Sequence, residues 1–298
     1  MFVHKIEERL PKNHSPKKVC SQNTISGSKT ASILNTNVSL RGGGSQTEPE
    51  FRDGAVAFLD ALGVKGIWSR TDPKTVIKAW EDTIALFVKS VRIAEEKTDY
   101  ICEEYHITAF SDTLIITLVG RDKGKEPRVL LPLMAEIITI PFIHALLRRI
   151  YFRGVISIGK FCRSENFIIG PAIDEAAEWY THPDWIGIST TPSASFGLDS
   201  LLEEGHPQFS KWFVRYNIPM RTGIEDKGWA LAWPMRVQDI FRNIPGLSRR
   251  ERNLLRRITP RTHILDAFAK LPIGISAISK YRNTLSFFDF VMGLKNKG

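Results

Sequence analysis

Residues 55–68 read AVAFLDALGVKGIW and residues 107–118 read ITAFSDTLIITL, and each stretch sets one aspartate in an apolar run of strand character. A carboxylate is costly to bury among apolar neighbours unless another group neutralises it. If the fold brings Asp60 and Asp112 together, their oxygens would suit Mg²⁺ or Mn²⁺. Two such ions can activate an attacking oxygen and hold a triphosphate, which favours phosphoryl chemistry on a nucleotide. The simpler interpretation makes each aspartate a turn or cap residue at a strand end.

The elements around these stretches alternate in a regular order. In chain order, we expect a strand over 55–62, a helix from 72–73 to about 96, hairpin strands over 105–110 and 113–119, a helix over 128–151, a strand from 154 and a helix from 171. The first six form the β-α-β-β-α-β order of a ferredoxin-like or palm-type α+β sheet with helices on one face. In that topology Asp60 and Asp112 can become neighbours. The run WALAWP, at 229–234, is expected to close a sheet edge.

Composition divides the 298 residues into three parts. Residues 1–50 are rich in Ser, Thr, Asn, Lys and Gly, which predicts a disordered arm. Residues 51–240 form the predicted folded domain. Residues 241–298 form a basic, mostly helical extension with 12 Lys and Arg against 3 Asp and Glu, so its net charge of +9 equals that of the whole chain. That charge could attract nucleic acid or an anionic surface, but the arginines at 249–261 also fit the solvated face of an amphipathic helix.

Cysteine usage and the N-terminal residues favour a cytoplasmic location. Cys20, Cys102 and Cys162 are widely spaced and form no CxxC or Cys/His pattern, so neither a disulfide framework nor a zinc site is indicated. The opening MFVHKIEERLPKN has no apolar run typical of a signal peptide. The longest apolar stretch, at 129–147, contains two prolines, a glutamate and a histidine, so we expect a buried helix rather than a membrane span.

Four segments in order carry a resemblance to a known family. They are FLDALGVKG at 58–66, FSDTLIIT at 110–117, FRGVISIGKF at 152–161 and NFIIGPAIDEAAEWY at 166–180. Together they resemble the catalytic domain of class III nucleotidyl cyclases, in particular the bacterial pyrimidine cyclases of Pycsar antiphage systems. The resemblance covers about residues 53–235 and implies that 51–240 is a cyclase domain. It also implies two Mn²⁺ or Mg²⁺ ions per site, held by the carboxylates of Asp60 and Asp112 and the carbonyl oxygen of Ala61.

The reaction implied is the conversion of a nucleoside triphosphate to its 3′,5′-cyclic monophosphate and pyrophosphate. Gly63 and Lys65 are candidate phosphate contacts in the turn after the first strand, although a plain turn would need a glycine too. Phe58 is counted among the substrate-binding residues. The family's Asn-x-x-x-Arg element aligns with Asp174 and Glu178, so the expected transition-state arginine is missing. These two acidic residues are expected to face solvent or a dimer contact.

Arg153, next to the strand from Gly154, is the candidate to replace that arginine, with Arg148 and Arg149 behind it. A positive charge is needed there because charge develops on the phosphoryl group during the reaction. The other interpretation makes Arg153 a surface residue that closes the C-terminus of the preceding helix.

The residues at the base-contact positions differ from those of adenylyl cyclases. Adenylyl cyclases place a Lys and an Asp where this chain has Thr108 and Phe167. The guanine-selecting Glu and Cys are absent as well. A threonine bonds only weakly to a base edge and Phe167 adds bulk, which favours a single-ring base. We expect UTP rather than CTP on family frequency alone, with a purine cyclase as an alternative.

Class III cyclases build their sites between two catalytic domains, so the resemblance implies a homodimer with two composite sites. The cyclic product would activate a separate effector protein in antiphage defence, and no stable nucleic-acid or membrane partner is expected. The alternative is a noncatalytic nucleotide- or RNA-binding module that uses the basic extension. Its binding would collapse with salt and survive the loss of Asp60.

Overall fold

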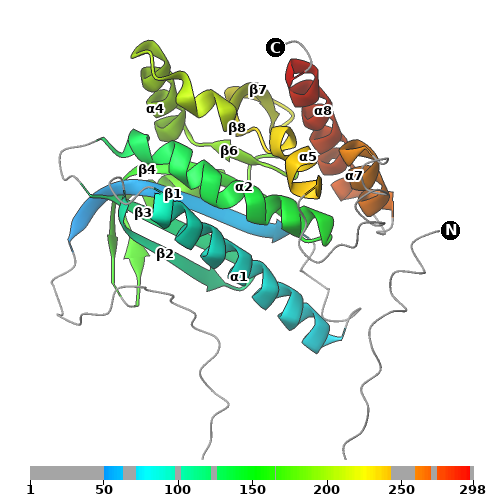
Figure 1. Ribbon diagram of the computed structural model, residues 1–298, viewed down its shortest axis with the longest axis horizontal. Helices are drawn as coiled ribbons and strands as arrows, with labels where there is room; N and C mark the ends of the chain where they lie inside the picture. The colour runs from blue at the N-terminus through cyan, green and yellow to red at the C-terminus, as the bar shows by residue number, and fades with distance from the viewer. Residues whose placement is uncertain are drawn as a thin grey trace, which may run out of the picture. The chain divides into compact units, whose positions relative to one another are not determined.

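An eight-stranded mixed sheet forms the centre of the fold, with the strand order β2-β3-β1-β4-β6-β8-β7 and the short β5 paired to β4 (Figure 1). The strands are β1 Phe51–Leu62, β2 Cys102–Phe110, β3 Thr113–Gly120, β4 Tyr151–Arg163, β5 Ile168–Ile169, β6 Ile188–Thr190, β7 Phe213–Pro219 and β8 Glu225–Leu231. β4 and β6 are parallel. The other pairs are antiparallel.

The helices are α1 Pro73–Lys97, α2 Leu131–Leu147, α3 Pro171–Trp179, α4 Pro192–Glu203, α5 Pro234–Arg242, α7 Pro260–Ala269 and α8 Ile278–Lys295. Short 3-10 helices are η2 Pro127–Leu130, η3 Pro207–Lys211 and η4 Ile275–Ala277. The predicted β-α-β-β-α-β order is confirmed as β1-α1-β2-β3-α2-β4. Figure 1 shows α1 and α2 side by side over the same face of the sheet, so the predicted α+β fold class is confirmed.

This computed structural model describes residues 50–62, 72–97, 102–121, 126–164, 166–242, 259–269 and 274–295. The chain divides into two units, Met1–Leu34 and Asn35–Gly298, and every described residue belongs to the second. The predicted disordered arm lies outside the described residues, apart from Glu50. So do Gly63, Lys65 and the arginines at 249–257.

The two faces of β1 are buried against different helices. Ala55, Ala57 and Leu59 join the main hydrophobic cluster with α1 and α2. Val56 and Phe58 join a smaller cluster with α3, which lies on the opposite face of the sheet. Because side chains alternate along a strand, Asp60 shares the α3 face.

The helix predicted over 128–151 ends at Leu147, so the prediction was four residues too long. Arg149 has the left-handed φ of 65°. The amide of Ile150 donates to the Ala145 carbonyl at 2.9 Å and the amide of Arg149 to the Leu146 carbonyl at 3.1 Å. These are the paired bonds of a Schellman motif, which usually carries a glycine where this chain has Arg149. Because no glycine marks the end of this helix, the apolar pattern continues into β4 and the predicted helix was too long.

Arg149→Gly is expected to raise the free energy of unfolding by up to about 1 kcal/mol, because a left-handed conformation costs an L-residue about 1–2 kcal/mol and glycine's greater unfolded freedom offsets part of the gain. Urea unfolding measures the difference. Arg148→Gly is the matched control: Arg148 has a φ of −87°, so this change should lower stability. A destabilised Arg149→Gly variant would contradict the left-handed helix end.

The sheet edge differs from the expectation for WALAWP. Its strand β8 lies between β6 and β7, so β7 and not β8 forms this edge of the sheet, with β2 at the opposite edge. β7 pairs along its length with β8 from Phe213↔Leu231 to Pro219↔Glu225. No strand was predicted over 213–219.

Among the helices in the described residues, α2 is the most apolar. Together with η2 it spans Pro127–Leu147, a helix long and apolar enough to cross a membrane, yet 72% of its most apolar window is buried inside the fold. This agrees with the expected core helix. Cys102 Sγ donates to the carbonyl oxygen of Glu104 at 3.2 Å and Cys162 is buried, while Cys20 lies outside the described residues.

A carboxylate in α3 ties three elements together. Glu175 Oε2 accepts hydrogen bonds from Ser157 Oγ of β4 and from Thr191 Oγ1, both at 2.9 Å. Its Oε1 accepts the amide of Ser193 at 2.9 Å, and the Ser193 hydroxyl donates to Oε2. Because Thr191 makes no side-chain cap of its own, Glu175 caps the N-terminus of α4 from a neighbouring helix.

Candidate active site

Asp60 is paired with Arg153 across β1 and β4. Arg153 Nε lies 2.9 Å and Nη2 lies 2.8 Å from Asp60 Oδ2. The side chains are only 8% and 14% exposed, so each charge neutralises the other in a largely buried setting. Arg153 is therefore a strand residue in the interior of the fold, and the interpretation as a surface residue at a helix end was wrong.

A third contact fixes the guanidinium. Arg153 Nη1 donates to the carbonyl oxygen of Thr181 at 3.1 Å. Arg153 thus bridges the end of β1 and the segment after α3. Gly154 lets β4 approach β1 at this point, since a Cβ there would lie 2.2 Å from the carbonyl oxygen of Phe58.

Asp112 lies in the two-residue turn that joins β2 to β3. Phe110 and Thr113 pair on either side of it, and Ser111 has a φ of 56°, as at the first central position of a type II′ turn. The carbonyl oxygen of Asp112 accepts the amide of Ala61 at 2.8 Å. The turn therefore lies against the end of β1, and Asp112 adjoins the residue that follows Asp60.

These groups fit the divalent ions that the sequence implied. Two carboxylates and the Ala61 carbonyl are hard oxygen donors, and both contacts of Arg153 go to Oδ2 of Asp60. Among the described residues, no three His, Cys, Asp or Glu side chains converge on a common point. Mg²⁺ is commonly held by one or two carboxylates together with substrate phosphates and water, and this donor set matches that pattern.

Arg221 is a further cation beside this pair, and sequence reasoning missed it. It lies in the turn between β7 and β8, where its amide donates to the His182 carbonyl at 2.9 Å. Partial burial and the charge of Arg153 lower the pKa of Arg221, while the carboxylates of Asp184 and Asp60 oppose that shift. The Arg221 side chain is exposed, and its backbone amide joins the β7–β8 turn to the segment that also holds Arg153. No motif marks Arg221, because its place depends on the pairing of distant loops.

The remaining predicted residues lie at different distances from this pair. Phe58 is buried on the α3 face, with its ring 5.8 Å from that of Tyr180. Thr108 is partly buried in β2, in the same cross-strand row as Phe58. Phe167 precedes β5 and is 44% exposed. The structure does not describe Gly63 and Lys65.

Asp174 and Glu178 on α3 are exposed, as predicted. Neither therefore belongs to the buried Asp60–Arg153 pair. The structure thus brings Asp60, Asp112 and Arg153 together and adds Arg221.

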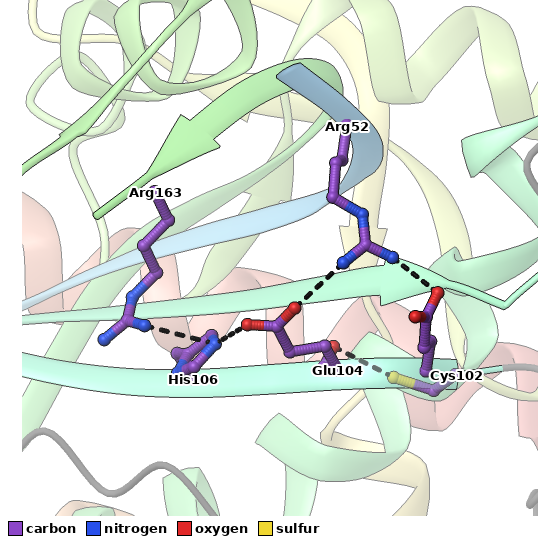
Figure 2. A network of polar contacts seen from close by, with 6 residues as sticks. Arg52, Cys102, Glu104, His106 and Arg163 are labelled. Atoms are coloured by element: carbon purple, nitrogen blue, oxygen red, sulfur yellow. Dashed lines mark hydrogen bonds and ion pairs between the residues drawn. The ribbon is translucent and has the colours of Figure 1, made fainter. Parts of the chain in front are cut away.

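A second polar network crosses the same face toward the other end of the sheet (Figure 2). His106 Nε2 contacts Glu104 Oε1 and lies 3.2 Å from Arg163 Nη1. Glu104 Oε2 in turn accepts a hydrogen bond from Arg52 at 2.9 Å. Arg163 leads into the turn that holds Phe167, so this network joins the strand of Thr108 to the turn of Phe167.

Glu104 is expected to contribute stability that depends on pH. The hydrogen bond from His106, with the charges of His106, Arg52 and Arg163, holds the pKa of Glu104 below its ordinary value of 4.5 although burial opposes the shift. This stability is present above pH 4.5 and is lost as pH falls through the lower folded-state pKa. Its size is modest, because the side chain is 42% exposed.

Urea unfolding of Glu104→Gln should therefore show a smaller loss of stability than the original protein as pH falls below 4.5. The exposed Glu178→Gln serves as the control and should follow the original protein. Parallel pH profiles for the Glu104→Gln variant and the original protein would contradict the contact network.

Comparison with known proteins gives a partial likeness in structure. No family model matches the sequence, and no curated protein matches it. Two structures of a bacterial light-regulated adenylyl cyclase match 65% and 71% of this chain, at 10% and 12% identity and TM-scores of 0.42 and 0.41. The catalytic core of a rhodopsin-guanylyl cyclase with converted specificity, in complex with ATPαS, matches 62% of this chain and 98% of its own, at 13% identity and a TM-score of 0.37. The present chain spans 59% of the length of the light-regulated adenylyl cyclase chains.

Proposed function

We propose that the protein is a nucleotidyl cyclase, which converts a nucleoside triphosphate to its 3′,5′-cyclic monophosphate and pyrophosphate. The supporting observation is the convergence of Asp60 and the Asp112 turn at one end of the sheet, with Arg153 bound to Asp60. Carboxylates that hold cations and arginines that hold phosphates are the groups that phosphoryl transfer requires.

The chain's own residues would bind and orient the triphosphate. When bound by Asp60, Asp112 and the Ala61 carbonyl, two Mg²⁺ or Mn²⁺ ions would supply Lewis acidity toward the ribose hydroxyl and the phosphates. The guanidinium groups of Arg153 and Arg221 are planar donors whose geometry matches that of phosphate oxygens. Their positive charge would oppose the negative charge that builds on the departing pyrophosphate. Arg153 is pre-oriented for this role by Thr181 and Asp60.

The substrate that we favour is a pyrimidine nucleotide, with UTP ahead of CTP. Thr108 offers a single hydroxyl where a purine cyclase would present a charged side chain, and the bulk of Phe167 at the second base-contact position favours a single-ring base. The preference for uracil rests on the family resemblance. A purine cyclase would keep the same phosphate chemistry and differ only at the base.

A homodimer would complete the site. Thr108 lies in a different cross-strand row from Asp60, and Phe110 in the row of Asp60 is 77% exposed. An exposed aromatic residue at a hairpin end fits a contact with a second copy of the chain. We further propose that the cyclic product acts on a separate effector protein in antiphage defence, at a cytoplasmic location.

Product identification tests this function. The purified protein is incubated with each of the four ribonucleoside triphosphates and Mn²⁺, and the products are identified by mass spectrometry. A cyclic pyrimidine monophosphate is expected, from UTP above CTP. A cyclic purine would keep the reaction and overturn the base assignment. If no triphosphate gives a cyclic product while the fold is intact, the cyclase proposal is wrong.

A further inference from the structure

The C-terminal helix α8 is fastened to residues 181–187, the segment that follows α3. Asn283 Nδ2 donates to the Asp184 carbonyl oxygen at 2.8 Å. The amide of Ile186 donates to Thr284 Oγ1 at 2.8 Å, and Thr284 is fully buried. Lys280 Nζ lies 2.9 Å from Asp184 Oδ1, with both side chains 15% exposed. Three side chains within little more than one turn of α8 thus hold one segment.

That segment in turn holds both arginines of the candidate active site. The Thr181 carbonyl accepts Arg153 Nη1 at 3.1 Å. The His182 carbonyl accepts the amide of Arg221 at 2.9 Å, and the Asp184 amide donates to the Pro219 carbonyl at 2.7 Å. A continuous set of hydrogen bonds therefore leads from α8 to Arg153 and Arg221.

Asp184 is the electrostatic link between α8 and the site. Burial alone would raise its pKa, but hydrogen bonds from Ser279 and Lys280 and the charges of Lys280 and Arg221 hold the pKa of Asp184 below its ordinary value. The carboxylate is therefore charged at neutral pH, and Lys280 and Arg221 are both cations near it. If Lys280 were neutral, Arg221 would be the main counter-charge left to Asp184.

We propose that α8 is a positioning element for phosphate binding. Lys280 neutralises Asp184, so that the charge of Arg221 is left to act at the Asp60 end of the sheet, where the nucleotide's triphosphate would bind. Asn283 and Thr284 hold the segment that orients Arg153. The identity of the natural ligand rests on the proposed cyclase function. The role of α8 concerns the binding of a triphosphate as such.

Calorimetry with inorganic triphosphate and Mg²⁺ tests this role without requiring catalysis. Lys280→Met should weaken triphosphate binding about tenfold, whereas Lys280→Arg should restore it to within about twofold because the positive charge is kept. Arg282→Met is the matched control, since Arg282 is an exposed cation on the same helix. It removes the same charge and should leave binding unchanged.

A double variant separates positioning from mere packing. Adding Asp184→Asn to Lys280→Met removes the unpaired carboxylate and should recover most of the lost affinity, as expected for coupled charges. With nucleotide substrate, Lys280→Met should raise KM with little change in kcat. Unchanged triphosphate binding in Lys280→Met, or no recovery in the double variant, would overturn the proposal.

The two proposals fail in different ways. Lys280-dependent binding of triphosphate without a cyclic product from any nucleotide would refute the cyclase and keep the role of α8. A cyclic product whose KM is insensitive to Lys280→Met would keep the cyclase and refute the role of α8.

Discussion

Asp112→Asn should lower the rate of cyclic nucleotide formation by about 10³-fold or more, because it removes one of the two carboxylate charges that would hold the divalent ions. The change leaves the turn intact, since Asp112 is tied to Ala61 through its backbone carbonyl. Asparagine also tolerates turn positions well. The loss should therefore appear in the rate and not in the unfolding curve. Initial rates of cyclic product formation at saturating Mn²⁺ measure it.

Asp174→Asn is the control for this prediction. Asp174 is exposed on α3, so the same chemical change there should leave the rate within about twofold, as expected for a surface substitution. If Asp112→Asn retained a rate within tenfold of the original protein, the hairpin aspartate would not be part of the site.

Glu175→Ala should lower the free energy of unfolding by about 3 kcal/mol, because it leaves several polar groups without their acceptor. Ser157, Thr191 and Ser193 all donate to this carboxylate. Ser157 and Thr191 are fully buried, so water cannot readily replace the lost bonds. The free energy of unfolding of Glu175→Gln should lie between those of the original protein and Glu175→Ala, because glutamine keeps the shape of the side chain and removes its charge. Urea unfolding at neutral pH gives the values.

Glu178→Ala is the matched control, one turn further along α3. Its side chain is exposed, so its removal should change stability by no more than about 0.5 kcal/mol. Equal effects of the Glu175 and Glu178 substitutions would show that the carboxylate of Glu175 does not hold α3, β4 and α4 together.

The neighbourhood of Asp60 and Asp112 could be predicted from the order of elements. The Ser-Asp pair predicted the turn of the hairpin, and the β-α-β-β-α-β order predicted that this hairpin lies beside β1. Both depend on local patterns of apolar residues and turn residues, which a sequence displays directly.

The partner of Asp60 was harder to predict. Arg153 was chosen as a cation near the site, but its burial follows from the helix end at Leu147, which lengthens β4 toward its N-terminus. Arg149 in a left-handed conformation marks that end, and an arginine gives no sequence signal for it. A one-turn error in a helix boundary thus decided whether Arg153 was read as a surface or an interior residue.

Arg221 and the contacts of α8 could not be predicted. They join residues far apart in the chain through backbone carbonyls at 181, 182 and 184. Every residue has a backbone carbonyl group, so no residue pattern reveals which carbonyl groups form such hydrogen bonds. The sequence shows the positive charge of the C-terminal extension. Only the structure distinguishes the inward-facing Lys280 from the solvent-exposed cations of that extension.

The most direct test of the central claim is the binding of Mn²⁺ in the presence of a UTP analogue that cannot cyclise, followed by electron paramagnetic resonance. The account predicts about two bound ions per site in the original protein, as two-metal sites hold, with a clear loss of bound Mn²⁺ in Asp60→Asn and none in Asp174→Asn. Equal Mn²⁺ binding by the original protein and Asp60→Asn would contradict the assignment of Asp60 to the metal–nucleotide site.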